Sequence, residues 1–131
     1  MKSNAHAVFD LKYHLVIVTK YRRKALTASM RALVKETFVS VLTKWRCEVV
    51  EFGGEADHVH LLFSAHPALE LSRVVNNLKT ASSRRLRNTF PEQVKRHYWK
   101  PVFWHRAYYI GSVGDASLET VKRYVANQKQ S

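Results

Sequence analysis

The stretch Asp57-His58-Val59-His60-Leu61-Leu62 opens an apolar run in the middle of the chain. Gly53-Gly54 come before it and Pro67 comes after it, which are boundaries typical of a β-strand. Side chains alternate along a strand, so His58 and His60 point to one face while the residues between and after them point to the other. The pattern therefore predicts a strand with one buried face and two imidazoles side by side on its opposite face.

Two imidazoles on one strand face can hold a metal ion, although the pair alone is a weak signal because ligation needs a third protein group. Ligand softness by itself favours zinc or another transition metal. Metal-binding barrels of the cupin type place a glutamate three or four residues after the pair, where this chain has Ser64 and Ala65, so that class is excluded. Asp57 is a candidate to orient His58, and capping or surface exposure is the other interpretation of this residue.

Length and charge set the broad class. At 131 residues the chain is expected to form one domain over 1–131. It carries 22 Lys and Arg against 10 Asp and Glu, a net charge of +12. Such an excess favours a polyanionic partner, nucleic acid first and an anionic membrane surface second. No apolar run approaches the ~20 residues of a membrane span, and the single Cys47 fits a reducing cytoplasm.

Hydrophobic periodicity predicts the elements around this strand. Strands are expected at about 13–19, 47–52, 58–64 and 103–110, and helices at about 26–45, 69–90 and 115–130. Thr27 and Asp115 are placed to cap the first and last helices, and Pro91 stops the middle one. The order β-α-β-β-α-β-α predicts an α+β fold with an antiparallel sheet flanked by helices, ferredoxin-like or RNA-recognition-like (RRM-like).

Basic residues gather on the second predicted helix and on a corner after the first strand. The segment 69–100 holds eight basic residues against two acidic ones. Aromatic residues at 98, 99, 103 and 104 follow it, and cations beside stacking aromatics are the combination that single-stranded nucleic acid uses. The alternative is a solvated helix face beside core aromatics. The candidate nucleic-acid contacts are Lys20, Arg22, Arg23, Arg73, Lys79, Arg84 and Arg87.

The last predicted helix carries a possible nucleophile. Thr120, Tyr124 and Gln128 lie four residues apart and therefore share one helix face. A tyrosine in a basic helix can attack phosphorus, and a glutamine carbonyl one turn further on can complete a metal site. Packing is the commoner role for a helical tyrosine, so the residues alone leave both roles open.

Four segments together resemble the single-tyrosine HUH transposases of single-strand insertion sequences, where HUH denotes His-hydrophobic-His. They span most of the chain in the order that this family has, and each is a modest match by itself. The segments are Tyr13–Arg23, Asp57–Leu62, Phe103–Gly114 and Tyr124–Gln128.

The resemblance implies a set of roles. His58, His60 and Gln128 match the metal ligands, Tyr124 matches the catalytic tyrosine, and the metal is Mg²⁺ or Mn²⁺. The family acts as homodimers that share active sites between subunits, with Gly111 to Gly114 as the joint of the tyrosine helix. Its members recognise hairpins at insertion-sequence ends and cut and rejoin single-stranded DNA. They pass through a 5′-phosphotyrosine link that leaves a free 3′-hydroxyl.

Three rival classes of protein share some of these features. A non-catalytic RRM-like module would use the basic helix and the aromatics without cleavage, but the Lys/Arg-Gly-aromatic signature of that type is missing. A replication or relaxase-type HUH nuclease shares the chemistry and is usually a larger protein. A transposase with three carboxylates is disfavoured, because four of the ten acids crowd around one hairpin: Glu48, Glu51, Glu55 and Asp57.

Overall fold

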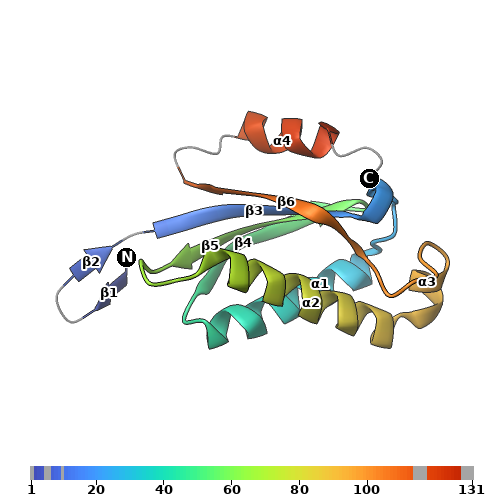
Figure 1. Ribbon diagram of the computed structural model, residues 1–131, viewed down its shortest axis with the longest axis horizontal. Coiled ribbons are helices and arrows are strands. Elements are labelled where there is room, and N and C mark those ends of the chain that lie inside the picture. The colour runs from blue at the N-terminus through green and yellow to red at the C-terminus, as the bar shows by residue number, and fades with distance from the viewer. Residues whose placement is uncertain (1, 5–6, 10, 114–117, 128–131) are drawn as a thin grey trace.

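The computed structural model describes residues 2–4, 7–9, 11–113 and 118–127, and a four-stranded sheet forms its centre (Figure 1). The sheet strands are β3 (Leu11–Thr19), β4 (Glu48–Glu55), β5 (His58–Ala65) and β6 (Trp104–Ser112). The helices are η1 (Lys20–Arg22), α1 (Ala28–Lys44), α2 (Leu71–Thr89), α3 (Pro91–Lys95) and α4 (Leu118–Asn127). A short hairpin of β1 (Lys2–Asn4) and β2 (Ala7–Phe9) precedes them.

The strand order is β4-β5-β3-β6, and every neighbouring pair is antiparallel. The predicted α+β fold is therefore confirmed, with the order β-α-β-β-α-β-α running from β3 to α4. The structure adds the β1–β2 hairpin, η1 and α3 to this plan.

The two long helices α1 and α2 cover one face of the sheet (Figure 1). Alternation along β5 turns Val59, Leu61 and Phe63 toward them, and all three are fully buried, as the sequence predicts. Thr27 caps α1 by accepting a hydrogen bond of 3.2 Å from the Met30 amide. The other main core side chains on this face are Leu15, Ile17, Met30, Val34, Phe38, Leu42, Val74, Val75, Leu78 and Leu86.

Two element boundaries differ from the prediction. The helix expected over 69–90 stops at Thr89, and Pro91 begins the separate short helix α3 because proline suits the first turn of a helix. The last strand continues through Gly111 to Ser112 instead of breaking there, because Gly111 pairs with His14 on β3. Asp115, the predicted cap of the last helix, lies outside the described residues.

Helix α4 lies over the opposite face of the sheet from α1 and α2 (Figure 1). Val16 and Val18 of β3 alternate with the core residues Leu15 and Ile17, so they belong to the α4 side, and both are fully buried. No helix in the described ranges is both long and apolar enough to cross a membrane.

Candidate active site

The sheet register places the histidine pair on the face that α4 covers. Across the four strands, one row of paired residues reads Gly53, His60, Val16 and Tyr109. Directly paired residues share a face, so the His60 imidazole and the Tyr109 ring lie on the same side of the sheet. His58 lies in the next row, and the His58 and His60 ring centroids are 6.4 Å apart with an interplanar angle of 31°. The two imidazoles therefore lie side by side on one face of the strand, as the sequence predicts.

The glycine pair before the strand makes room for His60. A Cβ on Gly53 would lie 2.7 Å from Nε2 and 2.8 Å from Cε1 of His60, closer than real carbon contacts. A Cβ on Gly54 would lie 2.4 Å from the backbone oxygen of His58. The first glycine thus accommodates a side chain of the candidate site, and the second accommodates the close approach of two backbones.

Asp57 orients His58. Its Oδ1 lies 2.9 Å from Nδ1 of His58, and its Oδ2 accepts a 2.8 Å hydrogen bond from Nε of Arg22. With the proton on Nδ1 of His58, the lone pair of Nε2 faces away from the carboxylate, as in metal sites where a carboxylate fixes the tautomer of a histidine ligand. Of the two roles that the sequence left open for Asp57, the structure favours orientation of His58.

Burial and charge set the protonation of this group. Burial raises the pKa of the Asp57 carboxyl, but the hydrogen bonds and charges of His58 and Arg22 outweigh burial, and the pKa lies below its ordinary value. Burial, followed by the nearby His58, lowers the pKa of His60. A lowered pKa keeps the His60 imidazole neutral at physiological pH, which is the form that binds a metal.

Tyr124 lies on α4 and packs against the sheet face that carries the histidines. Its ring centroid is 5.7 Å from that of Tyr109, which belongs to the same row as His60. The Tyr124 hydroxyl is buried, and the described residues give it no hydrogen-bond partner. Burial raises the pKa of this phenol. Tyr109 and His60 stand two strand spacings apart, roughly 10 Å.

Arg22 connects α4 to the histidine pair. The guanidinium that holds Asp57 also donates through Nη1 to the carbonyl of Ala126, at 3.4 Å. The last turn of α4 is thus linked through Arg22 and Asp57 to His58. Gln128, the predicted third ligand, lies outside the described residues.

The turn that carries Arg22 is strained. Tyr21 and Arg22 have φ of 60° and 54°, in the left-handed region that costs residues with a side chain roughly 1–2 kcal/mol each. Strain of this kind persists where surrounding contacts enforce it, and here the Arg22–Asp57 ion pair does so.

The two imidazoles have the chemistry of ligands for a divalent ion. His60 is kept neutral, His58 has one ring nitrogen engaged by Asp57, and both rings lie on one face, so the two imidazoles suit metal ligation. Within the described ranges, no group of three or more His, Cys, Asp or Glu side chains is arranged to hold a metal. Ligation of a metal by this pair would require a third protein group.

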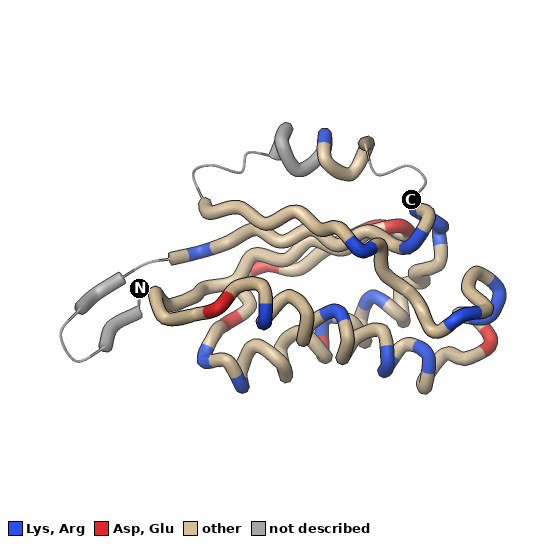
Figure 2. The backbone as a smooth tube through the Cα atoms, in the orientation of Figure 1, with Lys and Arg blue, Asp and Glu red and all other residues tan. Residues whose placement is uncertain are grey.

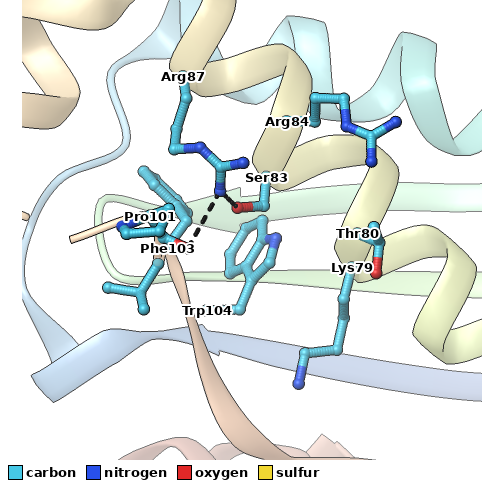
Figure 3. Close-up of a pocket in the computed structure, with 9 residues that line it drawn as sticks. Lys79, Thr80, Ser83, Arg84, Arg87, Pro101, Phe103 and Trp104 are labelled. Atoms are coloured by element: carbon cyan, nitrogen blue, oxygen red, sulfur yellow. Dashed lines mark hydrogen bonds between the residues drawn. The ribbon is translucent and has the colours of Figure 1, made fainter.

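Three of the predicted nucleic-acid contacts meet at one cavity. Lys79, Arg84 and Arg87 of α2 line a cavity of about 310 Å³ between this helix and the segment before β6 (Figure 3). Arg87 donates to Ser83 Oγ at 2.7 Å and to the Pro101 carbonyl at 3.3 Å. Arg84 is exposed and has no hydrogen-bond or ion-pair partner among the described side chains, so its charge faces the solvent.

The remaining predicted contacts are distributed over other parts of the molecule. Figure 2 shows Lys and Arg along the helical layer and at the end of the molecule where α3 and η1 lie. Lys20 and Arg23 flank the Tyr21 ring, at 5.3 Å and 5.0 Å from its centroid. Arg73 lies apart at the start of α2, where it pairs with Glu70 and stacks over Trp45.

The expected stacking aromatics are mostly core residues. Tyr98, Phe103 and Trp104 are buried in contact with one another, and Trp104 Nε1 donates to Ser82 Oγ at 2.9 Å. Of the two interpretations that the sequence left open, burial favours core aromatics for these three, because they close the end of the core between α2 and β6. Only Trp99 of the four is exposed.

Sequence reasoning missed two contributors to the site. Tyr109, the packing partner of Tyr124, was part of a matching segment, but only the register across β3 shows that it shares a face with His60. The sequence indicates Gly53 as part of the boundary before the histidine strand, whereas it lies within β4 directly opposite His60. A glycine at a fixed distance before a His-x-His strand is the signal that could have indicated this role.

Comparison with known proteins identifies a family. Residues 7–128 match the family model described as "Transposase IS200 like". The chain is 31% identical to the ISDra2 transposase TnpA of Deinococcus radiodurans over 98% of its length and 91% of that protein. It is 33% identical to the transposase for insertion sequence element IS200 of Salmonella typhimurium, over 97% of its length and 82% of that protein.

Solved structures give the same fold. A crystal structure of a Deinococcus radiodurans R1 protein classed as a transposase matches with a TM-score of 0.89 at 30% identity, over the full length of both chains. A tyrosine transposase bound to a REP hairpin matches with a TM-score of 0.56 at 10% identity, over 95% of this chain and 68% of that one. The second likeness concerns the fold alone.

Proposed function

This chain belongs to the IS200-like transposase family, and on that premise we propose that it cuts and rejoins single-stranded DNA at insertion-sequence ends, with Tyr124 as the nucleophile. The rejoining chemistry would proceed through a 5′-phosphotyrosine link. DNA with hairpin ends is the proposed substrate, which agrees with the net charge of +12.

One observation carries the proposal. The tyrosine helix and the His-x-His strand lie on the same sheet face, and the Arg22 guanidinium joins them by bonding Asp57 on one side and the Ala126 carbonyl on the other. A nucleophile and a metal-binding pair brought to one surface are the parts that a cut-and-join reaction on a phosphodiester needs.

We expect His58 and His60, with Gln128, to hold one Mg²⁺ or Mn²⁺ ion. When bound, such an ion would withdraw charge from the scissile phosphate and stabilise the departing 3′-oxygen. Asp57 keeps the His58 ring oriented, and Gly53 leaves the space that the His60 ring occupies.

The Tyr124 oxygen would attack the phosphorus, lose its proton, and form a bond to it as the bond from phosphorus to the 3′-oxygen breaks. The leaving oxygen takes up a proton, which gives a free 3′-hydroxyl and a 5′-phosphotyrosine. Attack by another 3′-hydroxyl on the same phosphorus reverses the step, so the energy of the original phosphodiester is kept and rejoining needs no nucleotide hydrolysis.

The packing of Tyr124 suggests a resting state, from which the phenol must move before it can attack a phosphate. Free tyrosine is about one part in a thousand ionised at pH 7, and burial against Tyr109 lowers that fraction further. The Tyr124 hydroxyl is buried without a partner among the described residues, which costs about 1–3 kcal/mol if it stays unpaired and favours its transfer to a site with a phosphate. We propose that α4 completes the histidine site of a second subunit in a homodimer when it leaves this position.

A covalent adduct tests the proposal. The full chain is incubated with single-stranded oligonucleotides that carry a hairpin and randomised flanks, with Mg²⁺ or Mn²⁺, and is resolved under denaturing conditions. A protein–DNA band that disappears in Tyr124→Phe and on chelation of the metal is expected, with DNA affinity near wild type in the variant. His58→Ala should reduce the adduct more than the affinity.

Two results would contradict the proposal. Tight DNA binding by the wild-type protein without any adduct would support the non-catalytic RRM-like module. An adduct that persists in Tyr124→Phe would move the nucleophile to another of the six tyrosines.

A further inference from the structure

Trp99 is the most exposed large hydrophobic residue among the described side chains, with 86% of its surface accessible. Its neighbour Tyr98 and the nearby Phe103 and Trp104 are buried. Single exposed hydrophobic residues are ordinary on protein surfaces, so exposure alone indicates nothing. The backbone support, the local charge and the hollows beside this indole are what distinguish it.

The backbone around Trp99 is held firmly. The Tyr98 hydroxyl donates to the Lys20 carbonyl at 2.6 Å, and the Lys20 amide donates to the Phe103 carbonyl at 2.8 Å. Arg23 Nη1 donates to the His97 carbonyl. The indole thus projects from a segment fixed to η1, and little conformational freedom of the backbone would be lost when a ligand binds.

The charged residues that line the hollows around Trp99 are all basic. Lys100 Nζ lies 5.3 Å from the centroid of the Trp99 ring, and no acidic residue occurs between Gln93 and Gly114. Two hollows of about 260 Å³ and 170 Å³ adjoin the ring, and both are lined by Trp99 and Lys100. Lys95 lines the larger hollow and Arg23 the smaller one, so an anion would find a cation on either side.

We propose that Trp99 is a stacking platform for an unpaired base of single-stranded DNA, with Lys100 and Arg23 as the partners of the flanking phosphates. Every base presents a flat π-face, and cations beside an exposed aromatic are the combination that single strands use. A duplex cannot use the platform in this way, because its bases are paired and stacked on one another.

The platform is linked to the candidate active site through η1, and in this respect it rests on the proposed function. Tyr98 and Arg23 fix the segment to η1, and Arg22 of η1 holds the carboxylate that orients His58. A base stacked on Trp99 would hold the unpaired strand next to the corner from which Arg22 reaches the histidine pair.

Binding without cleavage tests this platform. The full chain carrying Tyr124→Phe is titrated with an oligo-dT single strand without divalent metal, and tryptophan emission and fluorescence anisotropy are recorded. Stacking is expected to quench the emission. Trp99→Ala should weaken single-strand binding by about 5- to 150-fold, the range that corresponds to 1–3 kcal/mol per stacked base.

Matched variants separate stacking from other effects. Trp99→Phe keeps an aromatic face, so it should retain most of the affinity while losing the quench. Trp45→Phe removes another of the three tryptophans and should keep both the quench and the affinity. The affinities of Trp99→Ala and its parent for blunt duplex DNA of the same length should agree within about twofold.

Three results would overturn the platform: unchanged single-strand affinity in Trp99→Ala, equal losses for single strand and duplex, or emission changes with anionic phospholipid vesicles but not with DNA. A quench with single-stranded DNA in a protein that never forms an adduct would leave the platform standing while the proposed function fails. An adduct without any quench would support the proposed function and overturn the platform.

Discussion

At the scale of single residues, the position of the histidine pair depends on the absence of side chains at two neighbouring glycines. Gly53 pairs with His60 across the hairpin, and the imidazole occupies the volume where a Cβ would lie. Gly54 is constrained differently, because the obstacle next to it is the backbone of His58. A side chain at Gly53 would therefore disturb the site, whereas a side chain at Gly54 would disturb the fold.

We predict that Gly53→Ala displaces the His60 ring and lowers adduct formation at least about tenfold, while the melting temperature changes little. A side chain can move away, and alanine in a strand is otherwise favourable by about 0.5–1 kcal/mol. Gly54→Ala must shift backbone and should destabilise the protein by about 1–3 kcal/mol. Adduct assays and thermal unfolding check both variants, and equal behaviour of the two would contradict this division.

Tyr98 gives a prediction on pH. Burial raises the pKa of its phenol to about 12 from an unfolded value near 10, so between these pH values the folded state binds more protons. The stability that the neutral phenol contributes is complete below pH 10 and is lost as pH rises through 12, by up to about 2–3 kcal/mol. Denaturant unfolding from pH 9 to 12 should show a steeper decline in wild type than in Tyr98→Phe. Parallel declines would contradict the assignment.

At the scale of elements, η1 determines how the site is assembled. Its left-handed Tyr21 and Arg22 turn the Arg22 guanidinium toward Asp57, and the same group reaches the last turn of α4. A strand corner, a hairpin and the C-terminal helix thus meet at one arginine.

We predict that Arg22→Lys slows adduct formation about tenfold or more while DNA affinity stays within about twofold. Lysine keeps the positive charge but cannot bond two groups in the fixed fork of a guanidinium. Arg31→Lys on α1 is the matched control and should behave as wild type, because among the described residues its guanidinium donates to the Leu26 carbonyl alone. Rates of single-turnover cleavage measure both, and a wild-type rate in Arg22→Lys would show that the fork is dispensable.

The elements themselves were largely predictable, because period-two and period-3.6 patterns reflect which faces are buried. The strand at His58, the cap at Thr27 and the order of the main elements follow from such local patterns. The register that unites Gly53, His60 and Tyr109 depends on pairing between distant strands, which no local pattern encodes. For the same reason, the burial of Tyr98 and Trp104 could not be distinguished from a role in stacking.

At the scale of the whole molecule, charge is arranged by the fold as well as by composition. The chain has a net charge of +12, and some of its basic residues line a cavity beside α2, lie at the corner at η1 and line the hollows around Trp99. Lys79 is partly withdrawn from this surface, because its Nζ donates to the carbonyls of His105 and Arg106 on the edge strand β6. Burial, followed by the charge of Lys20, lowers the pKa of Lys79.

We predict that binding of single-stranded DNA weakens steeply with salt and that Arg84→Gln reduces the slope of log affinity against log salt by about 0.7. That value corresponds to one phosphate contact on a single strand. Lys35→Gln, an exposed change on α1, removes the same charge elsewhere and should leave the slope unaltered. Anisotropy titrations over a range of salt concentrations measure the slope for each variant. Equal slopes for Arg84→Gln and wild type would exclude the α2 cavity from the interface.

The most direct test of the account identifies the atom that joins protein to DNA. Adduct formed by the wild-type protein is digested with nuclease and trypsin, and the peptides are sequenced by mass spectrometry. Cleavage after Arg123 and Lys129 releases peptide 124–129, and we predict a 5′-phosphonucleotide on Tyr124. The nucleotide on any other side chain, or attached through its 3′-phosphate, would contradict the central claim that the tyrosine of α4 attacks the phosphate held at the histidine pair.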